Sequence, residues 1–350
     1  MSDAYASSGV DTHASDRAVA ALVDVLRAVD PGRPSRARLG SGHYAAVLEV
    51  APNLGIAVGT DGVGSKLVVA ERTGRLGTVG IDCVAMNAND IVCVGAEPIA
   101  LLDYIAVQQA DPEKLAEIGR GLRAGAEAAG VEIPGGEVAV LPELIQGHPS
   151  PGGFDLTAAC FGTVALDAMI TGADCVPGDA LIGLPSSGLH SNGYSLARRA
   201  LEPLGLDACP PALAGASVAD ALLEPTVIYV RAVLSLIRSE AIDVHGLAHI
   251  TGGGLLNLLR LNDGVGFAIE DPLPVPPVFG LVQERESVPE AEMWEVFNMG
   301  CGFCVACPAA HVDAAVAILA GAHPGTRRIG TVTDRAGRAE VPSRAVSLGG

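Results

Sequence analysis

The sequence predicts a two-domain protein of the α+β or α/β class, in which strands and helices are mixed. Its 350 residues exceed what one ordinary hydrophobic core accommodates. Residues 16–166 mix helix-like and strand-like segments, and a second mixed unit is assigned to residues 167–338. Residues 1–15 are small and polar and are expected to form an N-terminal arm, with residues 339–350 as a C-terminal tail.

The first domain is expected to contain nine elements. Four apolar residues between Val19 and Leu26 recur at helical spacing. Asp111-Pro112-Glu113 supplies a helix N-cap, a first-turn proline and a first-turn acid, and Gly130 ends that helix. The Gly135-Gly136 pair is expected to break the strand that contains it. In order, the elements are a helix at 16–29, strands at 47–50 and 54–60, a helix from Lys66, a buried helix at 82–94, a strand at 99–107, a helix at 112–129, and strands at 133–141 and 154–166.

The second domain is predicted from shorter segments separated by loops rich in Gly and Pro. Residues 272–277 are dense in proline and are expected to connect two elements. The predicted elements are a strand at 180–184, helices at 192–201 and 226–238, a short helix after 251–254, a helix at 291–297, a strand at 301–307 and a helix at 309–320, and residues 328–333 are expected to end the fold.

Composition and charge describe an acidic globular protein. Apolar residues make up 49% of the chain, which excludes a disordered polymer. The net charge of −18 argues against a surface that binds nucleic acid. Such a protein would need Mg²⁺ and backbone N–H groups to hold ATP.

A cytoplasmic location is expected. The first 20 residues lack the apolar segment of a signal peptide, and no run of 18 apolar residues indicates a membrane span. The eight cysteines are scattered through apolar stretches, which is typical of reduced thiols rather than disulfides.

An acidic, glycine-broken turn, Asp61-Gly62-Val63-Gly64-Ser65-Lys66, lies between a predicted strand and a predicted helix. The two glycines let the backbone approach a phosphate, while Asp61 could bind Mg²⁺ and Lys66 could neutralise charge. The turn is not a P-loop, which requires Gly-Lys-Ser/Thr. A tight turn with a helix cap is the alternative.

Further acids follow in a predicted helix. Asn87 and Asp90 are three residues apart and share a helical face. A buried aspartate needs a partner, either a cation or a group such as Lys66 or a backbone N–H. Asp82 could complete a carboxylate set with Asp61 and Asp90, of the kind that binds the Mg²⁺ bridging ATP phosphates.

Three more loops carry polar groups beside glycines. Glu137 follows the Gly135-Gly136 pair, in a site or in a turn. The loop 186–193 has hydroxyls, an imidazole and an amide before a helix, as an anion site or as a polar cap. The segment 249–254 places His249 before three glycines, as a backbone nest for an anion or as a structural histidine.

Two weaker patterns are noted. Cys301, Cys304 and Cys307 have metal-site spacing, but no fourth cysteine is near and the segment is typical of an apolar strand. Residues 40–44, which include His43, nearly match a dinucleotide-binding motif but follow no clear strand.

Together, and in this order, these motifs resemble the phosphoribosylformylglycinamidine cyclo-ligase family, the aminoimidazole ribonucleotide synthetases of purine biosynthesis. The matching runs are TDGVGSK (60–66), GIDCVAMNANDIVCVGAEP (80–98), LDY (102–104), GGE (135–137), SSGLHSNGYSL (186–196), HITGGGL (249–255) and EMWEVFNMG (292–300).

The resemblance implies a homodimer in which the sheet of the N-terminal ATP-binding domain joins its partner's in a shared barrel, next to a C-terminal α/β domain. The implied reaction converts formylglycinamidine ribonucleotide and ATP into 5-aminoimidazole ribonucleotide, ADP and phosphate. ATP would phosphorylate the formyl amide oxygen, and the amidine nitrogen would then attack that carbon and expel phosphate. The active site would lie between the domains, near the dimer interface.

The resemblance also implies roles for particular residues. Implied Mg²⁺ ligands are Asp61, Asp82, Asp90 and Glu137. Implied ATP contacts are Asp61, Gly62, Gly64, Lys66, Asn87, Asp90 and Glu137. Implied contacts to the ribonucleotide are Ser187, His190, Ser191, Asn192 and Thr251. The implied catalytic set is Asp61, Lys66, Asp90 and His249.

The chain departs from the family pattern at a few positions, notably Ala6, where the family usually has lysine. A selenophosphate synthetase would need an early cysteine, but the first is Cys83. A hydrogenase-maturation dehydratase would end in a cysteine. A thiamine-phosphate kinase is not expected to carry the runs HSNGYS (190–195) and HITGGG (249–254) together. A non-catalytic paralogue is the alternative of another class, which the retained carboxylates disfavour.

Overall fold

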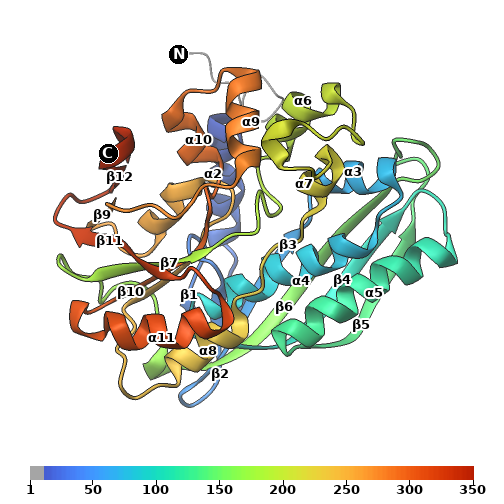
Figure 1. Ribbon diagram of the computed structural model, residues 1–350. Coiled ribbons are helices and arrows are strands. Elements are labelled where there is room, and N and C mark those ends of the chain that lie inside the picture. The colour runs from blue at the N-terminus through green and yellow to red at the C-terminus, as the bar shows by residue number, and fades with distance from the viewer. Residues whose placement is uncertain (1–11) are drawn as a thin grey trace.

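The computed structural model describes residues 12–350 as two sheets, each covered by helices (Figure 1). Residues 1–11 lie outside the described part, and with them most of the predicted arm. Residues 12–15, also assigned to the arm, belong to helix α2 (Thr12–Arg27). None of the helices within residues 12–350 combines the length and the apolarity needed to cross a bilayer.

The N-terminal sheet has six strands in the order β1-β2-β3-β6-β4-β5. Neighbouring strands are antiparallel except β4 and β5, which are parallel and connected through helix α5. The elements are β1 (Ala37–Leu39), β2 (Ala46–Ala51), β3 (Leu54–Gly62), α3 (Lys66–Thr73), α4 (Gly77–Val92), β4 (Glu97–Val107), α5 (Pro112–Ala129), β5 (Glu132–Val140) and β6 (Phe154–Ala165).

Helix α4 packs on one face of this sheet beside α5 (Figure 1). The two helices approach closely because glycines meet where they cross. A Cβ atom at Gly121 of α5 would collide with the carbonyl oxygen of Gly77, and one at Gly80 of α4 would collide with the backbone of α5. This crossing matters for function because α4 carries three of the predicted site residues.

We expect Gly121→Ala to lower the free energy of unfolding by about 1–3 kcal/mol, since the added methyl group forces α4 and α5 apart. Gly119→Ala is the matched control on the same helix, because a Cβ there would meet no heavy atom within 4 Å. That control should be neutral or slightly stabilising. Urea unfolding of both variants checks the prediction, and equal midpoints for the two variants would contradict it.

The C-terminal sheet has seven strands in the order β13-β12-β9-β11-β7-β10-β8. Its strands are β7 (Ala180–Pro185), β8 (Gly246–His249), β9 (Gly266–Ile269), β10 (Cys301–Cys307), β11 (Arg327–Thr333), β12 (Arg338–Val341) and β13 (Val346–Gly349). Its helices are α6 (Tyr194–Leu201), α7 (Val218–Leu223), α8 (Val230–Ile237), the 3₁₀ helix η4 (Gly254–Arg260), α9 (Pro277–Glu286), α10 (Glu290–Val296) and α11 (Val312–Ala322).

The prediction of a C-terminal tail at residues 339–350 is wrong. Strand β12 pairs with β9, and β13 pairs with β12, so the end of the chain extends the second sheet. Val346 and Leu348 alternate with exposed neighbours and bury their side chains in the core. The interpretation failed because this strand is only four residues long.

Several element boundaries also differ from the prediction. Helix α4 begins at Gly77 rather than Asp82, and α8 begins at Val230 rather than Thr226. Strand β5 continues through Gly135-Gly136 instead of breaking there. The short elements β1, β8, β9, α7 and α9 were not predicted. By contrast, the limits of α5, with Asp111 as N-cap and Gly130 in the left-handed region, are confirmed.

Candidate active site

The predicted acidic turn lies at the end of β3, where Asn87 of α4 holds it. The backbone N–H of Asp61 donates to Asn87 Oδ1 at 3.0 Å, and Asn87 Nδ2 donates back to the Asp61 carbonyl at 3.1 Å. The Gly62 N–H donates to the Asp61 carboxylate at 2.7 Å. Asn87 therefore holds the backbone of Asp61 in place and does not bond to the Asp61 carboxylate.

Asp90 joins the two domains through His249. The Nδ1 atom of His249, at the end of β8, lies 2.8 Å from Asp90 Oδ1. Asn89 Oδ1 accepts from the Tyr229 N–H, so Asn89 Nδ2 is the donor that faces His249 Nε2 at 3.4 Å. The imidazole therefore holds its proton on Nδ1, directed at the Asp90 carboxylate, and its ring orientation is fixed from both sides.

Burial, together with the nearby charge of Asp90, raises the pKa of the Asp61 carboxyl to about 6. The Gly62 N–H opposes this rise only in part. Two neighbouring carboxylates repel each other when both are ionised. A divalent cation bound to both would remove this repulsion. The donor set at Asp61 and Asp90 thus fits Mg²⁺.

We expect Asp61→Asn to stabilise the ligand-free protein at pH 8 by about 1–2 kcal/mol. The folded-state pKa is raised, so ionisation of Asp61 above pH 6 costs folding free energy, and below about pH 4 both states are protonated and the effect vanishes. The Asn oxygen can still accept from Gly62. Urea unfolding at pH 4 and pH 8 measures this, with the exposed Asp263→Asn as control. No gain at pH 8 would contradict it.

The structure places Lys66 and Asp82 in the interior, where they pair with each other; the resemblance implied an ATP contact for Lys66 and an Mg²⁺ ligand role for Asp82. Both side chains have zero exposure and form an ion pair, with Lys66 Nζ 2.8 Å from Asp82 Oδ2. Lys66 also donates to the carbonyls of His190 and Glu224, at 3.0 and 2.7 Å. The Thr226 N–H and hydroxyl both donate to Asp82, each at 2.7 Å. This pair ties α3 and α4 to two loops of the second domain.

The loop 186–193 is fixed largely by contacts with residues 225–229. Ser187 Oγ donates to the Pro225 carbonyl at 2.6 Å, and Ser191 Oγ lies 3.1 Å from Thr226 Oγ1. The His190 ring is buried against Tyr229, and burial holds the pKa of His190 well below its usual value. The geometry therefore does not present the His190 side chain to a phosphate, and it gives Ser191 a supporting position.

Asn192 and Thr251 remain partly exposed and lie on loops that meet. A Cβ atom on Gly252 would come within 3.1 Å of Asn192 Oδ1, which places the two loops in contact. The Thr251 N–H donates to Asn257 Oδ1 at 2.7 Å, and Asn257 Nδ2 donates to the Gly252 carbonyl at 3.1 Å. The glycine turn is therefore closed by Asn257, which sequence reasoning missed.

Glu137 lies apart from the other predicted metal ligands. In the sheet, β6 and β4 separate β5 from β3, so Glu137 is roughly 14 Å of strand spacing from the Asp61 strand. Within residues 12–350, no group of three or more His, Cys, Asp or Glu side chains is arranged to hold a metal ion. One chain alone therefore does not form the predicted four-carboxylate site.

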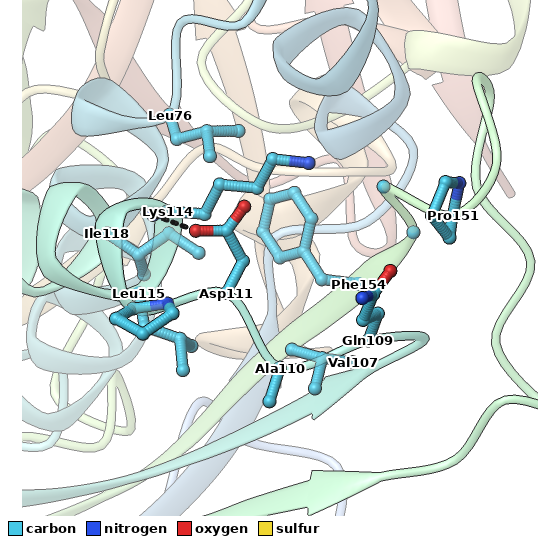
Figure 2. Close-up of a pocket in the computed structure, with 13 residues that line it drawn as sticks. Leu76, Val107, Gln109, Ala110, Asp111, Lys114, Leu115, Ile118, Pro151 and Phe154 are labelled. Carbon is cyan, nitrogen blue, oxygen red and sulfur yellow. Dashed lines mark hydrogen bonds between the residues drawn. The ribbon is translucent and has the colours of Figure 1, made fainter.

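Two other features are separate from these residues. Cys301 and Cys304 lie in the buried strand β10 with their sulfur atoms 3.5 Å apart, as the strand interpretation predicted. A hollow of about 230 Å³ lies at the N-terminus of α5, where Figure 2 shows the Lys114 side chain extending toward Phe154. None of the predicted site residues lines this hollow.

The sequence and the fold are similar to known proteins over most of their length. A family model described as AIR synthase related protein, N-terminal domain, matches residues 42–164, and the corresponding C-terminal domain matches residues 176–341. A phosphoribosylformylglycinamidine cyclo-ligase from Thermococcus gammatolerans is 48% identical over 90% of this chain and 91% of its own. One from Methanothermobacter thermautotrophicus is also 48% identical, over 96% of both chains.

Solved structures with lower identity share the fold. A hydrogenase maturation protein HypE in complex with ATP aligns with a TM-score of 0.60 at 21% identity, covering 87% of this chain and 86% of that one. A thiamine monophosphate kinase from Aquifex aeolicus aligns with a TM-score of 0.59 at 15% identity, covering 94% and 97%. These likenesses identify a two-domain fold of mixed sheets and helices.

Proposed function

Because the chain belongs to the AIR synthase related family, with the phosphoribosylformylglycinamidine cyclo-ligases as its relatives, we propose that the junction of its domains closes the imidazole ring of 5-aminoimidazole ribonucleotide. The activity is an ATP-dependent ligase reaction of purine biosynthesis that converts formylglycinamidine ribonucleotide and releases ADP and phosphate. The observation that carries this is the contact of Asp90, beside Asp61 in one domain, with His249 in the other.

Asp61 and Asp90 would hold the Mg²⁺ of bound ATP. That ion would neutralise phosphate charge during transfer to the formyl oxygen. His249 donates to Asp90, which keeps this carboxylate oriented. The glycine-broken turn that contains Gly62 and Gly64 would let backbone N–H groups approach the phosphates, a contact that an acidic protein needs.

Ser187, Asn192 and Thr251 would contact the ribonucleotide. They lie on the loops 186–193 and 249–254, which the contact of Asn192 with Gly252 brings together. Lys66, Asp82, His190 and Ser191 form the buried layer beneath them. These groups would position the ribonucleotide. The formyl amide oxygen leaves only after it is phosphorylated, so it must be held in line with the phosphate of ATP.

We further propose a homodimer in which the N-terminal sheets meet in a shared barrel. The sheet face opposite α4 and α5 exposes large apolar side chains on β4, namely Ile99, Leu102 and Tyr104, each at least 40% exposed. Such a patch suits an interface between subunits. Glu137 lies in register with Tyr104 on this part of the sheet, so it would serve the partner's site.

The dimer is tested by introducing a charge into this face. Leu102→Glu should give monomers by analytical ultracentrifugation and lose ADP release, whereas Leu144→Glu, on an exposed loop residue, should do neither. A parent protein that sediments as a monomer at assay concentration would refute the dimer. The cytoplasm remains our proposed location, supported by eight free cysteines, seven of them buried.

The reaction itself is tested by coupled measurement of ADP release with Mg²⁺, ATP and formylglycinamidine ribonucleotide. ADP should form only when the ribonucleotide is present, and 5-aminoimidazole ribonucleotide should appear in equal amount. The same assay with thiamine phosphate or with selenide is the comparison. Failure with the ribonucleotide, from protein that is folded by circular dichroism, would refute the proposal.

A further inference from the structure

Arg260, the last residue of η4, lies at the domain junction but had no predicted role. Its guanidinium carbon stands 5.3 Å from the centre of the Tyr44 ring, in the geometry of a cation–π contact. The Tyr44 hydroxyl donates to the Asn257 carbonyl at 3.0 Å, and Asn257 holds the turn at Thr251. The Tyr44 ring, on which the guanidinium lies, is therefore connected through Asn257 to the loop 249–254.

The Arg260 guanidinium forms no salt bridge with Asp61 or Asp90. Tyr44, over which Arg260 lies, borders the strand that carries Asp61, because a Cβ atom on Gly59 of β3 would stand 3.9 Å from the Tyr44 carbonyl oxygen. No salt bridge among the described residues includes Arg260, and its side chain is exposed. The other cation nearby, Lys66, is fully buried and already bound to Asp82.

His43, next to Tyr44, adds no competing charge. Its Nε2 lies 3.0 Å from the Thr171 carbonyl, so this atom carries the proton and the buried Nδ1 is an acceptor without a partner. Burial lowers the pKa of His43, and so does Arg260. The positive charge on this side of the junction therefore resides on Arg260.

We propose that Arg260 binds a phosphate group of a ligand at the domain junction. A guanidinium matches two phosphate oxygens at once, and stacking on Tyr44 fixes its plane in advance. In a protein of net charge −18, such a free cation offsets the repulsion that phosphates meet near Asp61 and Asp90. This inference rests on the proposed function, and the phosphate is either that of ATP or the 5′-phosphate of the ribonucleotide.

The two sources are separated by binding measurements that need no turnover. Isothermal titration would compare parent and Arg260→Gln with two probes, a non-hydrolysable ATP analogue with Mg²⁺ and ribose 5-phosphate. We expect the variant to bind one probe about 10–100-fold more weakly and the other nearly as the parent does. In the enzyme assay, KM for the corresponding ligand should rise by a similar factor.

Control variants separate ligand contact from folding. Arg260→Lys should recover part of the binding, because it keeps the charge but loses the planar fork. Tyr44→Leu should weaken the same probe as Arg260→Gln does. Arg123→Gln removes an exposed arginine of α5 that pairs with Glu127, and it should change neither probe. The variants of Arg260 and Arg123 should keep the parent's urea midpoint, whereas Tyr44→Leu loses a buried hydrogen bond to Asn257 and is compared under conditions where it is fully folded.

Binding of both probes to Arg260→Gln within twofold of the parent would overturn the inference, as would a parent that binds neither probe. These results are distinct from failure of the proposed function. A parent that binds a probe through Arg260 yet releases no ADP would refute the ring closure while supporting the phosphate contact.

Discussion

Lys66→Met is expected to lower the free energy of unfolding by about 3–5 kcal/mol, the cost of leaving a buried charge without its partner. Lys66 and Asp82 have zero exposure, so no water can solvate the carboxylate that remains. The loss also frees the carbonyls of His190 and Glu224. Because these contacts join the two domains, urea unfolding should shift as one transition for both.

The matched control is Lys114→Met on α5, an exposed lysine whose loss should cost less than about 0.5 kcal/mol. The double variant Lys66→Met with Asp82→Leu should recover part of the loss, since it removes both charges at once. If Lys66→Met unfolds at the parent's urea concentration, the buried ion pair is not holding the domains together.

Asp90→Asn is expected to lower kcat by about 10²–10³-fold while leaving the fold intact. The amide oxygen can still accept from His249 Nδ1, so the contact between the domains survives. What is lost is one of the two charges that would hold the cation of ATP. ADP release under saturating substrate measures the effect, and circular dichroism with urea unfolding verifies the fold.

Asp313→Asn, an exposed carboxylate on α11, serves as the control and should keep full turnover. Turnover of Asp90→Asn within threefold of the parent would mean that the cation is held elsewhere. Added Mg²⁺ should raise the thermal midpoint of the parent and not that of Asp90→Asn.

Local signals in the sequence predicted the elements whose stabilising contacts lie close along the chain. Asp111, Pro112 and Gly130 set the limits of α5 because capping involves neighbouring residues. The terminal strands escaped prediction because β12 is stabilised by pairing with β9, over seventy residues earlier in the chain, and β13 by pairing with β12.

The site shows the same division. Asp61, Asn87, Asp90 and His249 were identified from motif order, and the structure brings them to one junction. The sequence offered Lys66 as a partner for a buried aspartate, but its two backbone carbonyl partners have no signature in the sequence and could not be predicted. Thr226 and Asn257 stand in ordinary apolar segments, so nothing marked them as partners of Asp82 and Thr251.

The burial of Lys66 also has a practical consequence for chemical labelling. The chain contains only two lysines, and Lys114 is the exposed one. Of the two lysine side chains, an amine-reactive dye should therefore mark only that of Lys114 in the folded protein. The rate at which the dye labels Lys66, measured by mass spectrometry of the peptide that contains it, would give the rate at which the two domains separate.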